Sequence, residues 1–275
     1  MATPSKLAVI VENKTFGVEI ECFVPKAAWG DKPLNNYHTG LERARLYGTL
    51  LNIPGATDWR AEKDGSLSIT RVGEWVAVEI ISPILKGKDG VAQLKAVCEW
   101  LNNMGAVVNP KCGLHVTIGI DRSEKAKKHA MQIVSKYEPC LYAITGTKSR
   151  ENGVYSYPTA SKIARMLSGD RVTADKYDAF NMSKMPYGCV EFRYFAGTTN
   201  VNKILGYVAL CVGMVARAEE VSSVRSFAVD SCPIKGTDGM LKKYRKAMAT
   251  LLDKEDLRKV GGELNRLAAK YAAAV

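Results

Sequence analysis

The sequence lacks several of the patterns by which common protein classes are recognised. Its seven cysteines include no C-x-x-C pair, so we expect reduced thiols. It contains no G-x-x-x-x-G-K-[ST] segment and no Gly-rich strand-to-helix turn, which excludes a P-loop and the usual dinucleotide fingerprint. The opening MATPSKLAVIVENK has no signal-peptide pattern, and no stretch approaches about 18 apolar residues. We therefore expect a cytoplasmic protein that makes no contact with a membrane.

Acidic residues are in deficit, with 28 Asp and Glu against 39 Lys and Arg and a net charge of +11. Residues 235–270 alone carry ten basic and five acidic residues in segments with helical spacing. Clustered basic residues neutralise the phosphates of nucleic acids. The same pattern also fits a solvated helix face. A polyanion contact through the basic C-terminal helices and an ordinary exposed surface are therefore both open.

The chain of 275 residues is long enough to bury a substantial core. It has no internal repeat, no low-complexity tract and no linker long enough to separate independent domains. We expect residues 1–230 to form one domain and residues 231–275 to form a basic helical appendage packed on it.

Periodicity predicts strands that alternate with helices along the chain. Residues 14–24 alternate as a half-buried strand does, with Val18, Ile20 and Cys22 on one face and the two acids Glu19 and Glu21 on the other. The predicted strands cover 14–24, 57–62, 75–82, 114–120, 178–183 and 188–195. The predicted helices cover 40–52, 89–104, 123–143 with an interruption at Pro139, 161–167, 201–222, 238–252 and 255–273.

Acids or a histidine occur on four of these strands. Residues i and i+2 of a strand lie roughly 6.6 Å apart on one side, so Glu19 and Glu21 can serve one cation. Burying acids is costly unless a cation compensates. Several carboxylates with one imidazole suit Mg²⁺ or Mn²⁺ better than a closed zinc site. Isolated, the same residues also fit a solvated strand face, a core histidine and a local salt bridge. The set is Glu19, Glu21, Glu79, His115 and Glu191, with Arg193 beside Glu191.

Seven short motifs in order resemble the amidoligase family, distant relatives of glutamine synthetase and of gamma-glutamylcysteine ligase. The resemblance runs from about residue 14 to residue 210. The motifs are FGVEIE (16–21), DGS (64–66), VEIISPIL (78–85), CGLHV (112–116), KSRENGVY (148–155), KYDAFNMS (176–183) and VEFRYFAGTTN (190–200).

The resemblance implies an α+β fold with a curved, mostly antiparallel sheet like the catalytic domain of glutamine synthetase and with helices packed outside it. It implies metal ligands at Glu19, Glu21, Glu79, His115 and Glu191, and catalytic roles for Arg193 and Glu191. It implies substrate or phosphate binding by Arg150, Asp64, Ser66, Thr117 and Asn181. For Asp64 and Ser66 an ordinary Asp-Gly-Ser turn is an equally natural interpretation. Where such families commonly have a second histidine, this chain has Thr117, whose hydroxyl can donate a hydrogen bond but cannot act as a base near neutral pH.

The implied function is an ATP-dependent ligase that uses Mg²⁺ (or Mn²⁺) as cofactor. It would join a small-molecule or peptide carboxylate to an amine through an acyl phosphate. Two rival functions use the same residues or the same scaffold. One is a metal-dependent hydrolase or nuclease, and the other is a non-catalytic nucleic-acid-binding protein.

Overall fold

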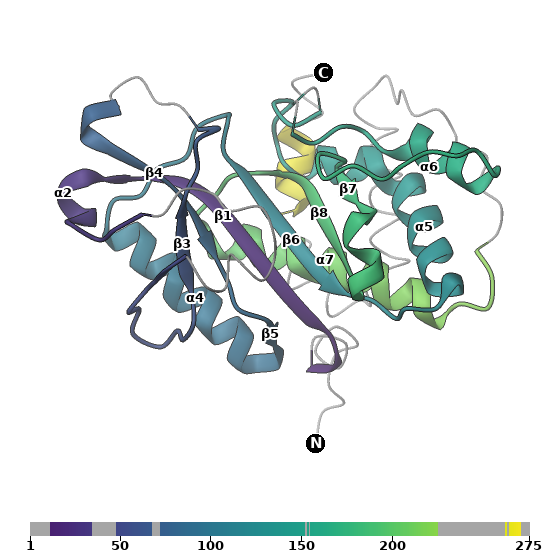
Figure 1. Ribbon diagram of the computed structural model, residues 1–275, viewed down its shortest axis with the longest axis horizontal. Coiled ribbons are helices and arrows are strands. Elements are labelled where there is room, and N and C mark those ends of the chain that lie inside the picture. The colour runs from purple at the N-terminus through teal and green to yellow at the C-terminus, as the bar shows by residue number, and fades with distance from the viewer. Residues whose placement is uncertain are drawn as a thin grey trace.

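A single open sheet of eight strands forms the centre of the described part of the protein (Figure 1). The structure, a computed structural model, describes residues 12–34, 48–67, 72–151, 153, 155–224, 262 and 264–270. The strands are β1 (Thr15–Pro25), β2 (Thr49–Leu50), β3 (Arg60–Lys63), β4 (Trp75–Ile81), β5 (Leu85–Lys86), β6 (Gly113–Gly119), β7 (Phe180–Asn181) and β8 (Cys189–Ala196). Their order is β2-β3-β4-β1-β6-β8-β7, with β5 paired to the start of β1, and every pair is antiparallel. This architecture confirms the predicted α+β class and its antiparallel sheet.

Strand β1 lies in the middle of the sheet, between β4 and β6, and its side chains alternate between two environments. Val18, Ile20 and Cys22 are at most 2% exposed and pack into the main hydrophobic core. Full burial of a side chain such as Ile20 contributes about 1.5–3 kcal/mol. Glu19 and Glu21 point to the opposite face, as the period of two requires. Antiparallel pairing with β4 on one side and β6 on the other then fixes which residues accompany these two acids.

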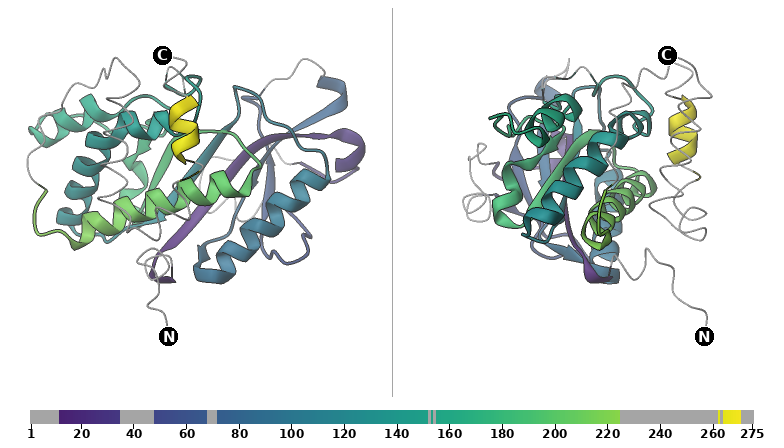
Figure 2. Two further views of the ribbon diagram at one scale, coloured as in Figure 1. Left: turned by 180° about the vertical axis from the view of Figure 1, so that it is seen from behind. Right: turned by 90° about the vertical axis from the view of Figure 1, so that its right-hand side faces the viewer.

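Helices cover one face of the sheet and one of its ends. Seen from behind in Figure 2, α4 and α7 cross the face that carries the apolar residues of β1. Helix α5 packs against α7 and α6 near β8. Asn200 caps α7 by accepting from two backbone N–H groups, and Ser123 caps α5. The helices are α2 (Lys26–Trp29), α4 (Gly87–Asn103), α5 (Glu124–Ala143), α6 (Ala160–Leu167) and α7 (Val201–Glu220), with 3₁₀ turns η1 (Val72–Glu74) and η2 (Met182–Tyr187).

Among the described helices, α7 is the one whose length and composition would allow it to cross a membrane. However, 72% of its most apolar stretch is buried inside the protein, as in a core helix. The six described cysteines are free thiols, as expected. The cytoplasmic location stays a prediction.

Three predicted elements are wrong in part. In the predicted helix 40–52, Thr49 and Leu50 form strand β2 instead. The next residue, Leu51, donates its N–H to the carbonyl of Trp59 at 2.8 Å, and residues 40–47 lie outside the described residues. Helix α5 is not interrupted at Pro139, because buried neighbours hold it to the core. The predicted strand 178–183 is reduced to β7, and η2 follows it directly.

The C-terminal prediction is described only in part. The predicted helix 238–252 lies outside the described residues, whereas residues 264–270 are helical as expected from the prediction for 255–273. Leu264 is buried over Gly206 of α7, and Leu267 is buried over Gly146. This segment therefore packs on the same core as the sheet. The domain boundary at residue 230 and the polyanion contact stay predictions.

Candidate active site

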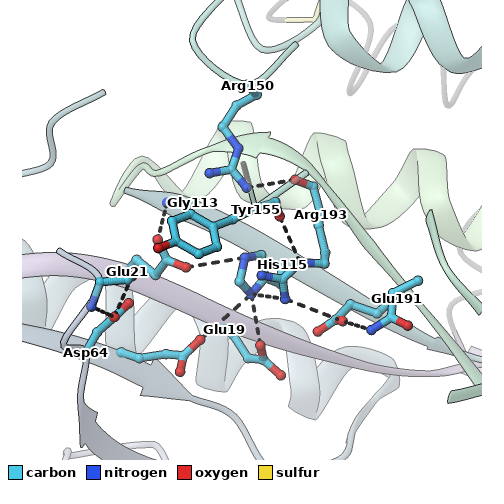
Figure 3. A network of polar contacts seen from close by, with 12 residues as sticks. Glu19, Glu21, Asp64, Gly113, His115, Arg150, Tyr155, Glu191 and Arg193 are labelled. Atoms are coloured by element: carbon cyan, nitrogen blue, oxygen red, sulfur yellow. Dashed lines mark hydrogen bonds and ion pairs between the residues drawn. The ribbon is translucent and has the colours of Figure 1, made fainter. Parts of the chain in front are cut away.

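The strand register gathers acidic side chains and a histidine on the face of the sheet that α4 and α7 leave free (Figure 3). Residues directly opposite each other on antiparallel strands share a face. Glu19 on β1 lies opposite His115 on β6, and Glu21 lies opposite Glu79 on β4. Glu79 in turn lies opposite Glu62 on β3. Four strands therefore place these side chains in one connected group.

His115 lies at the centre of this group and is 2% exposed. Its Nδ1 lies 2.9 Å from Glu19 Oε2 and 3.8 Å from Glu79 Oε1. Its Nε2 lies 3.3 Å from Glu21 Oε1 but makes no hydrogen bond, although it is buried. Buried polar atoms are rarely left without a partner. The imidazole thus directs an unused ring nitrogen at a carboxylate.

Glu191 on β8 completes the group from the other side and is 1% exposed. Its Oε2 accepts a 2.6 Å hydrogen bond from Asn181 Nδ2 and lies 3.5 Å from Arg193 Nη1. Its Oε1 accepts a 2.8 Å hydrogen bond from Lys184 Nζ, which also lies 3.6 Å from Glu19 Oε1. Every carboxylate oxygen of Glu191 therefore has a cation or an amide beside it.

Two arginines border the group. Arg193 donates from Nε to the carbonyl of Tyr155 at 3.2 Å, and Arg150 donates from Nη2 to the carbonyl of Arg193 at 2.9 Å. Gly113 leaves room for them: a Cβ there would lie 3.0 Å from Arg150 Nη2 and 3.1 Å from His115 Nε2. The backbone N–H of Gly113 also donates to Glu21 Oε2 at 2.5 Å. The glycine of the CGLHV motif thus lets a guanidinium, an imidazole and a carboxylate converge.

The other predicted binding residues are placed less centrally. Asp64 and Ser66 bond to each other in an exposed turn, where Asp64 Oδ1 accepts from Ser66 N and Oγ at 2.7 Å. Thr117 lies opposite Glu191 on the same face. The Asn181 side chain donates a hydrogen bond to Glu191 and accepts hydrogen bonds from Ser183, so both ends of its amide contact other residues of the protein. Substrate or phosphate binding by these residues stays a prediction.

Electrostatics within the group favour a bound cation. Burial raises the pKa of Glu79 well above its ordinary value, and the charges of Glu19 and Glu21 raise it further. Burial also acts to raise the pKa of Glu19, but Lys184 and the hydrogen bond with His115 outweigh it and hold that pKa below the ordinary value. Arg193 lowers the pKa of Glu79 but does not outweigh these effects, so Glu79 has less cationic compensation than Glu19.

Two triads of ligand atoms could hold a metal ion, and in each triad the three atoms lie within 4.8 Å of one another. Carboxylate oxygens with one imidazole nitrogen are a donor set that suits Mg²⁺ or Mn²⁺. The buried, unbonded Nε2 of His115 agrees with that donor set. The triads are Glu19 with His115 and Glu191, and Glu21 with Glu79 and His115.

Residues 12–176, more than half of the chain, match the family described as "Putative amidoligase enzyme". The chain belongs to this amidoligase family. No protein with a curated function matches the sequence. The matched segment of the amidoligase carries Glu19, Glu21, Glu79 and His115, and it ends before β8, which brings Glu191 and Arg193 to the same site.

Two solved structures resemble the amidoligase at low similarity. A bifunctional glutathione synthetase from Pasteurella multocida is 10% identical, with a TM-score of 0.48 over 98% of this chain and 50% of that one. GmaS in a complex with ADP is also 10% identical, with a TM-score of 0.42 over 98% of this chain and 72% of that one. The amidoligase thus spans half the length of the glutathione synthetase.

Sequence reasoning missed two charged members of the group. Lys184 lies in η2, between the KYDAFNMS motif and β8, where no periodic pattern marks a lysine as inward-facing. Glu62 is 2% exposed, and its only sequence signal is the alternation of the four-residue strand β3. Both were identifiable only once the register and the path of η2 were known.

Glu79→Gln is expected to stabilise the metal-free amidoligase while weakening its metal binding. A carboxyl whose folded pKa is raised binds its proton more tightly when folded, so stability is lost as pH rises from the ordinary value of 4.5 towards the folded pKa. In EDTA the wild-type melting temperature should therefore fall as pH rises, and the variant should show a flatter profile. The gain at pH 8 should be about 2–4 °C for each kcal/mol of repulsion relieved.

The matched control is Glu124→Gln, which makes the same change at a side chain that is 90% exposed. Its thermal profile against pH should follow that of the wild type. A lower melting temperature for Glu79→Gln than for the wild type at pH 8 in EDTA would contradict the repulsion described here.

Proposed function

We propose that this amidoligase is an ATP-dependent carboxylate–amine ligase that works with a divalent cation, Mg²⁺ or Mn²⁺. The observation that carries the proposal is the buried group in which His115 Nε2 lies unbonded 3.3 Å from Glu21, with Arg193 at its edge. Membership of the amidoligase family supports the same reaction class.

The reaction has to overcome the poor leaving group of a carboxylate. Transfer of a phosphoryl group from ATP converts the carboxylate into an acyl phosphate and releases ADP. The amine then attacks the acyl carbon, the tetrahedral oxyanion collapses, and phosphate leaves as the amide forms. A bound divalent cation supplies charge neutralisation for the transferring phosphoryl group.

The chain's own residues would hold and orient the reactants. Glu21, Glu79 and His115 offer ligands for the cation, and Glu19 and Glu191 lie beside them. Arg193 donates through Nε to the Tyr155 carbonyl, while its Nη2 makes no hydrogen bond to the described residues. That free N–H group can donate to a phosphate or to the oxyanion. Arg150, which the Arg193 carbonyl anchors, can add a second positive charge.

The test is a screen for ADP release with carboxylates against amines in the presence of Mg²⁺. Release that requires both substrates supports the ligase. Hydroxylamine in place of the amine should give a hydroxamate from the acyl phosphate. Hydrolysis of nucleic acid without ATP would instead support the metal-dependent hydrolase or nuclease. Salt-dependent DNA binding without nucleotide binding would support the non-catalytic nucleic-acid-binding protein.

Binding of ATP is expected to depend on the metal. ATP with Mg²⁺ should raise the melting temperature because it binds the folded protein. At 100 times its Kd this binding adds about 2.7 kcal/mol to the free energy of unfolding. ATP with EDTA should raise it far less, and AMP with Mg²⁺ serves as a control that lacks the β- and γ-phosphates. Equal shifts for ATP in both conditions would mean that lysines and arginines hold the phosphates without a metal.

A further inference from the structure

The half of the site formed by Glu19 and Glu191 already contains cations from the chain itself. Lys184 Nζ lies 2.8 Å from Glu191 Oε1 and 3.6 Å from Glu19 Oε1, so one ammonium joins the two carboxylates. Arg193 Nη1 lies 3.5 Å from the other oxygen of Glu191. Two positive charges therefore face two negative charges, and little attraction remains there for a further cation.

The fold holds the ammonium of Lys184 in this position. Asn181, at the start of η2, accepts from the backbone N–H of Ser183 and donates its amide to Glu191 at 2.6 Å. The carbonyl of Lys184 accepts from Gly188, which closes the same turn. One asparagine thus ties the turn that carries the lysine to the carboxylate that the lysine contacts. The ammonium is built into the site and does not reach it from a free surface.

The two ring nitrogens of His115 have different roles in the two halves of the site. A carboxylate can only accept, so the 2.9 Å contact with Glu19 Oε2 requires Nδ1 to carry the proton. In that tautomer the 3.4 Å contact of Nδ1 with Arg193 Nη1 lies between two donors and is not a hydrogen bond. Nε2 is then left with its lone pair directed towards Glu21. Metal-bound histidines commonly donate their other N–H group to a carboxylate in this way.

The half formed by Glu21 and Glu79 has the opposite charge balance. Within the described ranges, neither carboxylate forms an ion pair with a lysine or an arginine, and both are at most 8% exposed. Glu62, also buried, lies directly opposite Glu79. Arg193 acts on Glu21 and Glu79, and Arg150 acts on Glu21, but neither arginine forms an ion pair with these two carboxylates. Burial of the two carboxylates is costly, so a cation bound directly between them would stabilise the folded protein.

We propose that, in the nucleotide-free protein, Lys184 takes the cation position between Glu19 and Glu191, and that one divalent cation binds at His115 Nε2, Glu21 and Glu79. The inference rests on the proposed function only in taking this face as the metal site. It assigns Glu19 a positioning role, in which it orients His115 and pairs with Lys184. The chain therefore binds one divalent cation where the donor atoms alone would allow two.

The test counts Mn²⁺ bound per chain in nucleotide-free protein, by equilibrium dialysis with metal analysis and by electron paramagnetic resonance. Wild type should bind one Mn²⁺ without spin coupling. Lys184→Gln removes the ammonium and should bind two Mn²⁺, close enough to couple. Lys184→Arg, the control that keeps the charge, should bind one. Melting curves in EDTA check that each variant is folded.

Two further variants test the assignment without touching Lys184. Glu19→Gln keeps an oxygen that can accept from Nδ1, so it should still bind one Mn²⁺, about 10–100 times more weakly. Glu21→Gln should bind none. Two Mn²⁺ in the wild type, or one Mn²⁺ in folded Lys184→Gln, would overturn the role of Lys184 and leave the ligase proposal standing. No Mn²⁺ in any variant would overturn both.

Discussion

Glu21→Gln is expected to lose Mn²⁺ binding and to lower ADP release by at least about a hundredfold. Even partners that only orient metal ligands contribute 10–100-fold, and Glu21 is the carboxylate nearest to the unbonded Nε2 of His115. The Gly113 N–H fixes its orientation. The variant should remain folded, because glutamine keeps the volume and relieves repulsion with Glu79. The measurements are metal content and the rate of ADP release.

Glu124→Gln is the matched control for that experiment, since it makes the same change at an exposed side chain. It should keep the metal and the rate of the wild type. If Glu21→Gln kept one tightly bound Mn²⁺, the cation would have to be held elsewhere.

Arg193→Lys is expected to lower turnover by on the order of a hundredfold, as loss of a charged hydrogen bond in a transition state typically does. Lysine keeps the charge but loses the planar fork that lets the guanidinium donate to Tyr155 and to a phosphate at the same time. Because no metal ligand is lost, a titration with Mg²⁺ should not restore the rate. Substrate binding should change less than turnover.

The control for Arg193→Lys is Arg165→Lys, at an arginine whose side chain is 65% exposed and pairs with Asp170 on the surface. Its turnover should equal that of the wild type. Recovery of Arg193→Lys at high Mg²⁺ would mean that the arginine acts by holding the metal site together and does not donate to the phosphate.

The sequence predicted the fold where one local pattern agrees with the final environment. In β1 the period of two coincides with an apolar face and an acidic face, so both the strand and the face that holds Glu19 and Glu21 were predictable. In α4, Leu94, Val97 and Leu101 form the buried stripe that its spacing indicates. Such segments carry their structural information locally.

Prediction failed where contacts distant in sequence outweigh the local pattern. Thr49–Leu50 has helical apolar spacing with the residues before it, but pairing with β3 makes it a strand. Pro139 interrupts a helix by its chemistry, yet the neighbouring Glu138 accepts from Thr159 and Tyr194 and holds α5 to the core. Neither contact can be read from a window of a few residues.

The candidate site was predictable in its acids and less so in its cations. Glu19, Glu21, Glu79, His115 and Glu191 stand on strands within recognisable motifs, and the structure brings all five together. Lys184 reaches the site from a 3₁₀ turn, where side-chain direction follows from the turn and the Asn181 cap. The sequence therefore predicted which acidic residues come together and did not predict the ammonium that lies between Glu19 and Glu191.

Inherited or engineered substitutions in strand β1 are expected to have two kinds of effect, which alternate from one residue to the next. Val18, Ile20 and Cys22 pack in the core, whereas Glu19 and Glu21 between them lie on the face of the proposed metal site. Under the proposed function, substitutions at the even positions are expected to reduce the amount of folded protein, whereas substitutions at these two odd positions are expected to leave that amount intact and to lower activity. Neighbouring codons of one gene segment would thus produce two separate phenotypes, alternating with the pleat of the strand.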